Sequence, residues 1–240
     1  MDTVSVIIPS YNRFQYLIKA IASVKRQSHP VEIIVVNDCS TEPEYTTYDF
    51  GDTQIIHLEK SSRELFGYAS PGYVRTVGVK KSRGAYIAFL DDDDTWFPNK
   101  IELQLAAMKL HGCRMSCTDG LIGDGFYDSK KWYKIYMREH YYDTILAIFK
   151  SKNSTLLDNG FPSVWTLDFL KQHNCCIASS VLIERSLLEK INYMKYIRNS
   201  FEDYDCWLRA LEHTNCAFVK EICVYYDLGL ERPRNDGRES

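Results

Sequence analysis

Four consecutive aspartates, Asp91 to Asp94, carry the most distinctive chemistry in this sequence. They directly follow an apolar run at 85–90 that is typical of a buried strand. Adjacent carboxylates repel one another unless a cation relieves the repulsion. A cluster of oxygen ligands suits a hard divalent ion, Mg²⁺ or Mn²⁺, and such ions commonly keep open positions for substrate phosphates. The run therefore predicts a metal site that holds a phosphorylated ligand at the carboxyl end of a strand.

Other charged residues could contribute to the same site, and each also has a simpler explanation. Asp38 ends an apolar run and could accept hydrogen bonds from a ribose or a base, although such residues often form ordinary turns. Arg75 could pair with Asp38 or meet a diphosphate through its planar fork, although a lone helical arginine is more often a solvated surface charge. Asp203 and Asp205 begin a helical segment, where carboxylates commonly cap the helix. One of them could instead act as a general base, but they point in different directions, so only one can serve.

The elements that position these residues alternate between strand and helix in the first half of the chain. Such alternation favours an α/β fold with a doubly wound, mostly parallel sheet, in which ligands bind at the carboxyl ends of the strands. Polar clusters that begin at Ser10, Asn37 and Asp91 all follow predicted strands. Apolar runs predict strands at 4–9, 31–36, 53–58, 85–90 and 115–118, and helical spacing predicts helices at 13–27, 72–81 and from 98 to about 112.

The second half of the chain is less regular. Residues 120–160 are rich in Tyr, Lys and Asp and are expected to form a long excursion over the substrate site, with helical spacing only at 145–149. Further elements are expected as a strand at 179–183, a short helix that Ser186 caps and that runs to 191, a helix at 202–213 and a final strand at 216–226.

Composition and length narrow the class of protein. The 240 residues are 45% hydrophobic, which is enough for a sizeable core. The net charge of −3 gives no electrostatic argument for nucleic acid or for bulk anionic membrane. We expect no membrane span and no signal peptide, because no segment has the required length or flanking charge. The eight cysteines match no zinc spacing, so we expect reduced thiols in a cytoplasmic protein.

Four motifs, taken together and in this order, resemble the family-2 glycosyltransferases of GT-A fold. The resemblance implies a Rossmann-like, mostly parallel central sheet flanked by helices, with a smaller acceptor-side region. It implies one domain over 1–240: a nucleotide-sugar-binding half to about residue 118, an acceptor-binding and catalytic half from about 119 to 230, and a polar tail at 231–240. The motifs are the opening strand and loop at 4–13, the second strand and loop at 33–41, the strand and D-x-D motif at 84–94, and the E-D motif at 201–209.

The activity that this resemblance implies is inverting transfer of a hexosyl or deoxyhexosyl group by a single displacement. The donor would be a nucleotide-diphosphate sugar, UDP- or GDP-linked, the acceptor a hydroxyl of a glycan or glycoconjugate, and the cofactor Mn²⁺ or Mg²⁺. Asp203 would be the catalytic base, and Asp93 with Asp91 would hold the metal. Nucleotide-sugar contacts are implied for Pro9, Tyr11, Asn12, Arg13, Asp38, Arg75, Asp91 and Asp92, and contacts to the acceptor or the diphosphate for Glu202, Trp165, Arg232 and Arg234. The aromatic residues Trp132, Tyr133 and Tyr136, like Trp165, are expected on the acceptor side.

The sequence also departs from the family pattern. Asp92 stands where the family often has Ser, and the common Ala-Arg-Asn is Val74-Arg75-Thr76. No histidine follows the last predicted strand, where some relatives place a metal ligand. A Gln-x-x-Arg-Trp motif is absent from the chain, so a processive polysaccharide synthase is not expected.

Three other functions remain open. The segments 91–95 and 123–128 imitate the motifs of haloacid-dehalogenase phosphatases, in which the first aspartate is a covalent nucleophile, but they are too close to leave room for the sheet between them. A nucleotidyltransferase would have a glycine-rich loop after the first strand, and residues 10–13 contain no glycine. A non-catalytic nucleotide-sugar-binding module would bind the donor and tolerate the loss of Asp203.

Overall fold

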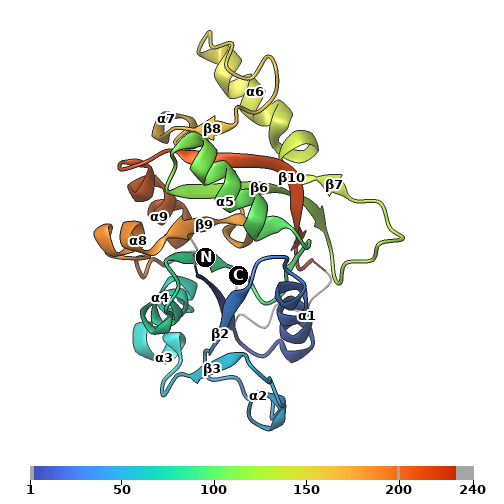
Figure 1. Ribbon diagram of the computed structural model, residues 1–240, viewed down its shortest axis with the longest axis vertical. Coiled ribbons are helices and arrows are strands. Elements are labelled where there is room, and N and C mark those ends of the chain that lie inside the picture. Colours follow the sequence, from blue (N-terminus) through green and yellow to red (C-terminus); the bar gives the residue numbers. More distant parts are fainter. Residues whose placement is uncertain (1–2, 199–200, 231–240) are drawn as a thin grey trace.

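A computed structural model describes residues 3–198 and 201–230. One curled sheet, flanked by helices, runs through the molecule in the order β3-β2-β1-β4-β9-β6-β10-β5, with β7 on β6 and β8 on β10 (Figure 1). The strands are β1 (Val4–Ser10), β2 (Val31–Asn37), β3 (Gln54–His57), β4 (Tyr86–Phe89), β5 (Thr95–Trp96), β6 (Met115–Gly123), β7 (Lys134–Ile135), β8 (Val164–Trp165), β9 (Leu182–Glu184) and β10 (Cys216–Asp227).

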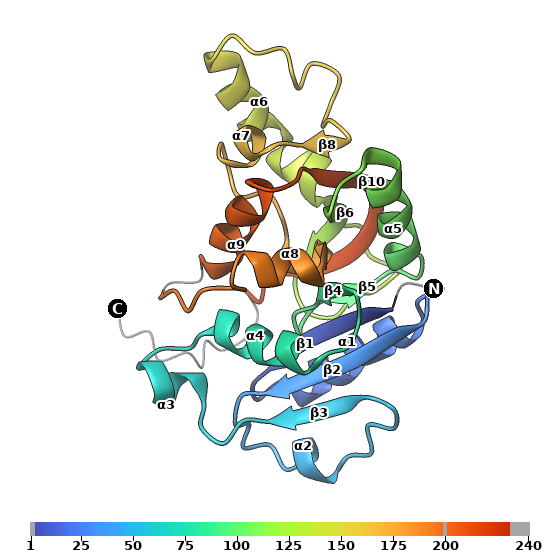
Figure 2. The same ribbon diagram turned by 60° about the vertical axis from the view of Figure 1, so that its left-hand side comes forward.

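The helices lie on the faces and at the far end of this sheet. In both views α6 and α7 lie at the opposite end of the molecule from α2 and β3 (Figure 2). They are α1 (Phe14–Lys25), α2 (Glu44–Thr47), α3 (Ser62–Phe66), α4 (Pro71–Lys81), α5 (Lys100–His111), α6 (Tyr142–Ser151), α7 (Leu167–Leu170), α8 (Arg185–Lys190) and α9 (Glu202–Leu211), with a π-helix η1 (Tyr136–Tyr141) and a 3₁₀ turn η2 (Ala178–Ser180).

The first half of the chain forms the parallel part of the sheet. Strand β1 pairs in parallel with β2 and β4, and β2 pairs in parallel with β3. Alternate residues of β1 contribute to two cores: Val6 and Ile8 pack in the core that contains Phe14 of α1, and Ile7 packs in the core that contains Val74 of α4. Burial of β1 on both faces explains the continuous apolar run at 4–9. The predicted α/β fold is confirmed by the similarity to a solved structure of the same fold.

The second half joins the sheet through β9, which is antiparallel to both β4 and β6. Two antiparallel steps restore the direction, so β6 runs parallel to β4, and β10 runs parallel to β6. The carboxyl ends of β1, β2, β4, β6 and β10 therefore lie at one edge of the sheet. The expected convergence of polar loops at this edge is thus a consequence of the topology. The domain boundary predicted near residue 118 falls within β6 and stays a prediction.

Several predicted boundaries in the second half are wrong. The strand expected at 115–118 continues to Gly123, because β10 pairs along its whole length. Residues 178–180 form a 3₁₀ turn, so the strand expected from 179 begins only at Leu182. Ser186 lies inside α8, whose N-cap is Glu184. The excursion at 120–160 contains β7, η1 and α6, of which α6 buries Ile145 and Phe149.

The structure also bears on membrane-spanning helices and on the state of the cysteines. Across residues 3–198 and 201–230, every helix is too short or too polar to cross a membrane. All eight cysteines carry free thiols.

Candidate active site

The four aspartates after β4 form a tight turn in which the Asp94 amide donates to the Asp91 carbonyl oxygen at 3.1 Å. Their side chains alternate in direction. Those of Asp91 and Asp93 are 30% and 14% exposed, whereas those of Asp92 and Asp94 are buried. Within the described residues, no group of three or more acidic, histidine or cysteine side chains is arranged to hold a metal ion. Of the four side chains, those of Asp91 and Asp93 present oxygens to the open side, and the assignment of a metal ion to this pair stays a prediction.

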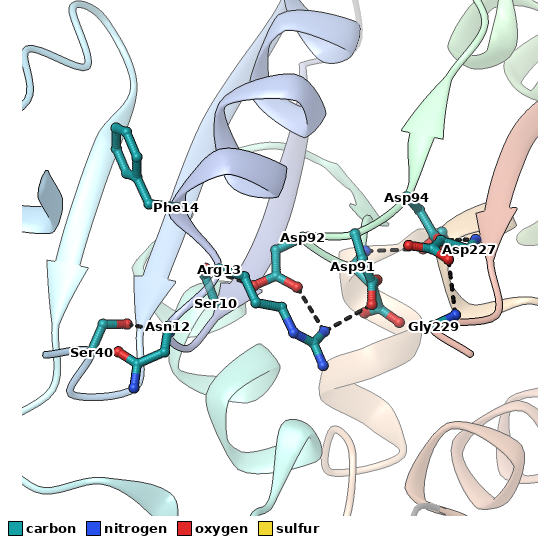
Figure 3. Close-up of polar contacts among 12 residues, drawn as sticks. Ser10, Asn12, Arg13, Phe14, Ser40, Asp91, Asp92, Asp94, Asp227 and Gly229 are labelled. Atoms are coloured by element: carbon teal, nitrogen blue, oxygen red, sulfur yellow. Dashed lines mark hydrogen bonds and ion pairs between the residues drawn. The ribbon is translucent and has the colours of Figure 1, made fainter. Parts of the chain in front are cut away.

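Asp94 has a structural role in this turn. Its carboxylate accepts a hydrogen bond from the Ser179 hydroxyl in η2. It also accepts one from the Asp227 backbone amide at 2.9 Å (Figure 3). The Ser179 hydroxyl also accepts from the Asp91 amide at 2.9 Å. Burial raises the pKa of Asp94 well above its usual range. Asp94 thus fixes the turn to the ends of β10 and η2.

Asp92 and Asp93 share a cation from the loop after β1. The Arg13 guanidinium lies 3.1 Å from an Asp92 oxygen (Figure 3). It also lies 2.8 Å from an Asp93 oxygen. Asp92 also accepts from the Ser10 hydroxyl at 2.7 Å. Burial, reinforced by the charge of Asp93, raises the pKa of Asp92 to about 7. Arg13 therefore supplies part of the positive charge that the acid run requires.

The loops after β1 and β2 are tied together by Asn12. This residue adopts a left-handed backbone with φ of 50°, which asparagine tolerates better than most residues. The side-chain oxygen of Asn12 accepts from the Thr41 backbone amide at 2.7 Å, and the Asn12 backbone amide donates to the Ser40 hydroxyl at 2.9 Å. Beside it, Tyr11 is half exposed, and Pro9 lies within β1. Asn12 is therefore placed to shape the loop, while Tyr11 is open to a ligand.

Asp38 forms the turn contact that its residue type suggests. Its two oxygens accept from the Ser62 amide and from the Ser62 hydroxyl, both at 2.6 Å, at the start of α3. Burial raises its pKa. The carboxylate lies at the expected sheet edge and fixes α3 there. Ser62 gave no signal in the sequence, because α3 is too short to show a period.

Arg75 is a buried residue of α4, so the alternative of a solvated surface charge is wrong. Its guanidinium donates to Asp91 and, at 3.2 Å, to Glu202 at the start of α9. Glu202 is buried against it, so a contact from Glu202 to an acceptor is wrong for this conformation. The close approach requires Gly72, because a Cβ there would lie 2.8 Å from the Glu202 Cγ. Arg75 therefore connects the acid run to the first turn of α9.

The two candidate bases on α9 differ in their partners. Asp205 is engaged by Lys195 at 3.2 Å and by Arg209 at 2.7 Å. Asp203 forms no ion pair in the part of the chain that the structure describes, and it accepts a hydrogen bond from the Tyr204 amide at 2.6 Å. Burial raises the pKa of Asp203 to about 6, although the nearby Arg75 opposes the rise. Of the two, Asp203 is thus the carboxylate without an ion-pair partner among the described residues, and its role as a base stays a prediction.

The other residues expected on the acceptor side differ in how exposed they are. Trp165 is fully buried and stacks on Phe218 with ring centroids 4.5 Å apart, so its assignment to the acceptor side is wrong. Tyr136 is also buried, edge-on against the ring of Tyr226. Trp132 is 77% exposed, so its place on the acceptor side stays a prediction. The predicted contacts of Arg232 and Arg234 lie outside the described residues.

The sequence reasoning missed several residues that hold this site together. Tyr45 of α2 is buried, and its hydroxyl contacts the Ser10 hydroxyl and accepts from the Arg13 amide at 3.2 Å. Ser179 and Asp227 were missed as well, since neither lies in a motif. Their partners are distant in the sequence, so only the pairing of β4, β6, β9 and β10 reveals them.

Comparisons with known proteins agree with one another. The model of the family "Glycosyl transferase family 2" matches residues 5–166. An uncharacterized glycosyltransferase of Rickettsia bellii is 46% identical over 109 residues, which are 44% of this chain and 15% of that protein. The Escherichia coli protein WfgD, named UDP-Glc:alpha-D-GlcNAc-diphosphoundecaprenol beta-1,3-glucosyltransferase, is 27% identical over 230 residues, which are 94% of this chain and 77% of WfgD.

Solved structures share the fold at low sequence identity. The crystal structure of Staphylococcus aureus TarS 1–349 in complex with UDP has a TM-score of 0.62 and 19% identity, over 94% of this chain and 60% of TarS 1–349. The same TarS segment has also been solved with UDP-GlcNAc. The matched part of this chain spans at most 17% of the first Rickettsia relatives.

Proposed function

This chain belongs to glycosyl transferase family 2, and from that premise we propose that it transfers a sugar from a nucleotide-diphosphate donor to an acceptor hydroxyl. The observation that carries the proposal is the placement of three groups at one sheet edge. Asp91 and Asp93 face outward after β4, Arg75 joins Asp91 to Glu202, and Asp203 follows Glu202 at the start of α9. A donor-binding acid run and a candidate base are thereby linked through one buried guanidinium.

For the donor we propose a UDP-linked hexose or deoxyhexose. The neighbour TarS has been solved with UDP and with UDP-GlcNAc, and the name of WfgD gives UDP-Glc as its donor. For the acceptor we propose a glycan or glycoconjugate. The eight free thiols support a reducing, cytoplasmic location.

The residues at the edge fit a divalent cation. Mg²⁺ and Mn²⁺ take oxygen ligands, and Mg²⁺ is commonly bound through one or two carboxylates together with substrate phosphates. Asp91 and Asp93 are the two partly exposed carboxylates of the acid run. The shared contact of Arg13 with Asp92 and Asp93 indicates that this run needs positive charge. Asp93 and Asp91 would hold the ion, which when bound would offset the charge that develops on the leaving diphosphate.

The remaining chemistry belongs to side chains of this protein. Asp203 accepts the proton of the acceptor hydroxyl as its oxygen attacks the anomeric carbon on the face opposite the diphosphate. A pKa of about 6 leaves Asp203 ionised at neutral pH yet basic enough to take the proton. A single displacement inverts the anomeric centre. Arg75 keeps Asp91 and the first turn of α9 in a fixed relation, so the base and the donor stay aligned.

Calorimetric titration of the chain with UDP and GDP, each with and without Mn²⁺, tests the proposal. We expect UDP to bind with Mn²⁺ and Asp93→Asn to weaken that binding strongly. NMR of the product formed from a UDP-sugar should then report an inverted anomeric configuration. Absence of nucleotide binding, together with release of phosphate from an aryl phosphate, would favour the phosphatase alternative and overturn the proposal.

A further inference from the structure

One exposed segment has no role in the proposed chemistry. We call residues 129–134, which end at the first residue of β7, the β6–β7 tip. It carries Trp132, which is 77% exposed, and three exposed lysines, Lys130, Lys131 and Lys134. Figure 1 shows the connection between β6 and β7 projecting well beyond the body of the molecule. An aromatic ring in water lacks the stabilisation that burial would give it, and here the exposed ring is accompanied by three exposed lysines.

The tip is a built turn. The Asp128 carbonyl oxygen accepts from the Lys131 amide at 3.0 Å, and the Asp128 carboxylate accepts from the Lys130 amide at 2.9 Å. The Tyr133 hydroxyl accepts from the Asp128 amide at 3.0 Å. Below the turn, the ring of Tyr127 packs on those of Tyr133 and Tyr225. The rings of Tyr127 and Tyr133 therefore pack together at the base of the segment, where Tyr127 is 39% exposed, whereas Trp132 is 77% exposed.

The charge of the tip differs in sign from that of the chain. The whole chain has a net charge of −3, whereas residues 129–134 contain three lysines and no acid. Within residues 3–198 and 201–230, none of these lysines forms an ion pair, and the adjacent Asp128 engages only backbone amides. Counted with Asp128, the turn thus carries a net charge of +2 around one exposed indole.

The tip also leaves the sheet at the edge that holds the candidate active site. Strand β6 is parallel to β4, so the tip follows the same carboxyl ends as the acid run. The Gly125 amide donates to the Asp227 carboxylate at 3.0 Å, and the Asp227 amide donates to Asp94 at 2.9 Å. A continuous set of hydrogen bonds therefore joins the base of the tip to the acid run.

We propose that the β6–β7 tip docks on an anionic lipid bilayer. Trp132 lies at the level of the headgroups, and the three lysines contact anionic headgroups. Tryptophan prefers the membrane–water interface, and each lysine near an anionic leaflet strengthens binding by about fivefold. The excess of lysines over acids in the turn complements an anionic lipid surface. Docking in this way turns the carboxyl edge of the sheet, with its acid run, toward the membrane surface.

The tryptophans of this chain make the test specific. Trp96, Trp165 and Trp207 are at most 2% exposed, so Trp132 is the one indole that a change of solvent can reach. The full chain is mixed with vesicles of phosphatidylcholine alone or of phosphatidylcholine with phosphatidylserine. We expect the emission to shift to the blue and acrylamide quenching to fall with the anionic vesicles only, and salt to reverse both effects.

Variants distinguish docking through the β6–β7 tip from attraction to vesicles by any exposed lysine. Lys130→Gln with Lys131→Gln should weaken vesicle co-sedimentation by about 25-fold, and Trp132→Ser should weaken it further and abolish the fluorescence response. The matched control is Lys80→Gln with Lys81→Gln, another adjacent exposed pair, at the end of α4 on the opposite edge of the sheet. Equal losses of vesicle co-sedimentation in the two double variants would overturn the proposal. So would a Trp132 emission spectrum that stays the same with every vesicle.

Discussion

Asp203 and Asp205 are two residues apart on α9, yet within the described residues only Asp205 is held by ion pairs. Asp205 is bound by Lys195 and Arg209, whereas burial raises the pKa of Asp203 to about 6. We predict that Asp203→Asn retains donor binding and lowers turnover by about 10²–10⁴-fold, the usual contribution of a general base. Initial rates and donor titrations on the same preparation measure the two effects.

The same carboxylate predicts the pH dependence of turnover. A base must be ionised, so kcat should fall as pH drops through about 6 and should level off above it. Asp205→Asn is the matched control, since it removes an acid from the same helix and should leave this acidic limb in place. An acidic limb that persists in the residual activity of Asp203→Asn would exclude Asp203 as the base.

Arg75 and Glu202 form a buried ion pair, and such a pair has a distinctive response to mutation. Arg75→Met leaves Glu202 buried without its cation, so we expect the free energy of unfolding to fall by about 3–5 kcal/mol. Adding Glu202→Gln to that variant should restore part of the loss, because the uncompensated charge is gone. Urea unfolding of both single variants and the double variant measures the coupling. Strictly additive losses would show that the two residues do not stabilise each other.

At the scale of elements, η2 determines the shape of the acid turn. The Ser179 hydroxyl bonds both the Asp91 amide and the Asp94 carboxylate. The equally buried Ser180 hydroxyl, within the described residues, bonds only the carbonyl oxygen of Ile177. We predict that Ser179→Ala costs about 1–3 kcal/mol of stability and weakens Mn²⁺-dependent UDP binding, because buried partners lose their hydrogen bonds. Ser180→Ala should leave UDP binding unchanged. Thermal unfolding and calorimetry compare the two variants, and equal UDP affinities would remove the role assigned to η2.

The parallel part of the sheet could be predicted from the sequence because its signals are local. A strand buried on both faces is an unbroken apolar run, and β1, β2 and β4 appear as such. Polar loops at their carboxyl ends then follow from the fold class, which is how Asp38 and Asp91 were found. These inferences need no knowledge of distant contacts.

The rest depends on pairings between segments that lie far apart in the chain. Strand β9 has three residues, and its place between β4 and β6 leaves no local pattern. For the same reason Ser179 gave no signal, since its partners lie 85 and 88 positions away. Trp165 was assigned to a ligand because an aromatic in an irregular region resembles a binding residue, whereas it stacks in the core. Burial of such residues becomes visible only once β8 pairs with β10.

At the scale of the whole molecule, one buried lysine should make the free energy of unfolding depend on pH. Lys100 is fully buried; its ammonium nitrogen lies 2.7 Å from the Gln104 side-chain oxygen and 4.0 Å from the centre of the Trp96 ring. Burial lowers its pKa from 10.5 to about 7. The unfolded chain therefore holds a proton that the folded chain lacks between about pH 7 and 10.5. Across that window this group makes stability rise with pH, by at most about 1.4 kcal/mol per unit.

Lys100→Met removes this dependence. We expect the variant to be more stable than the parent at pH 7, because no charge is buried, and the advantage to shrink as pH rises toward 10. Urea unfolding at a series of pH values gives the difference in free energy of unfolding between the two proteins. Because other groups titrate in both proteins, their contributions cancel in this difference. A constant difference across the series would mean that Lys100 keeps its ordinary pKa in the folded chain.

The insertion of β9 beside β4 also has a consequence for biosynthesis. While the chain emerges from the ribosome, β1 to β4 can assemble early, but the free side of β4 gains its partner only after residues 90–181 have been made. At ordinary elongation rates that interval lasts on the order of 5–20 seconds. For that time a nascent apolar edge is open to pairing with another chain. Slow translation or crowded expression should therefore favour inclusion bodies, and a chaperone that shields the half-made sheet should raise the yield.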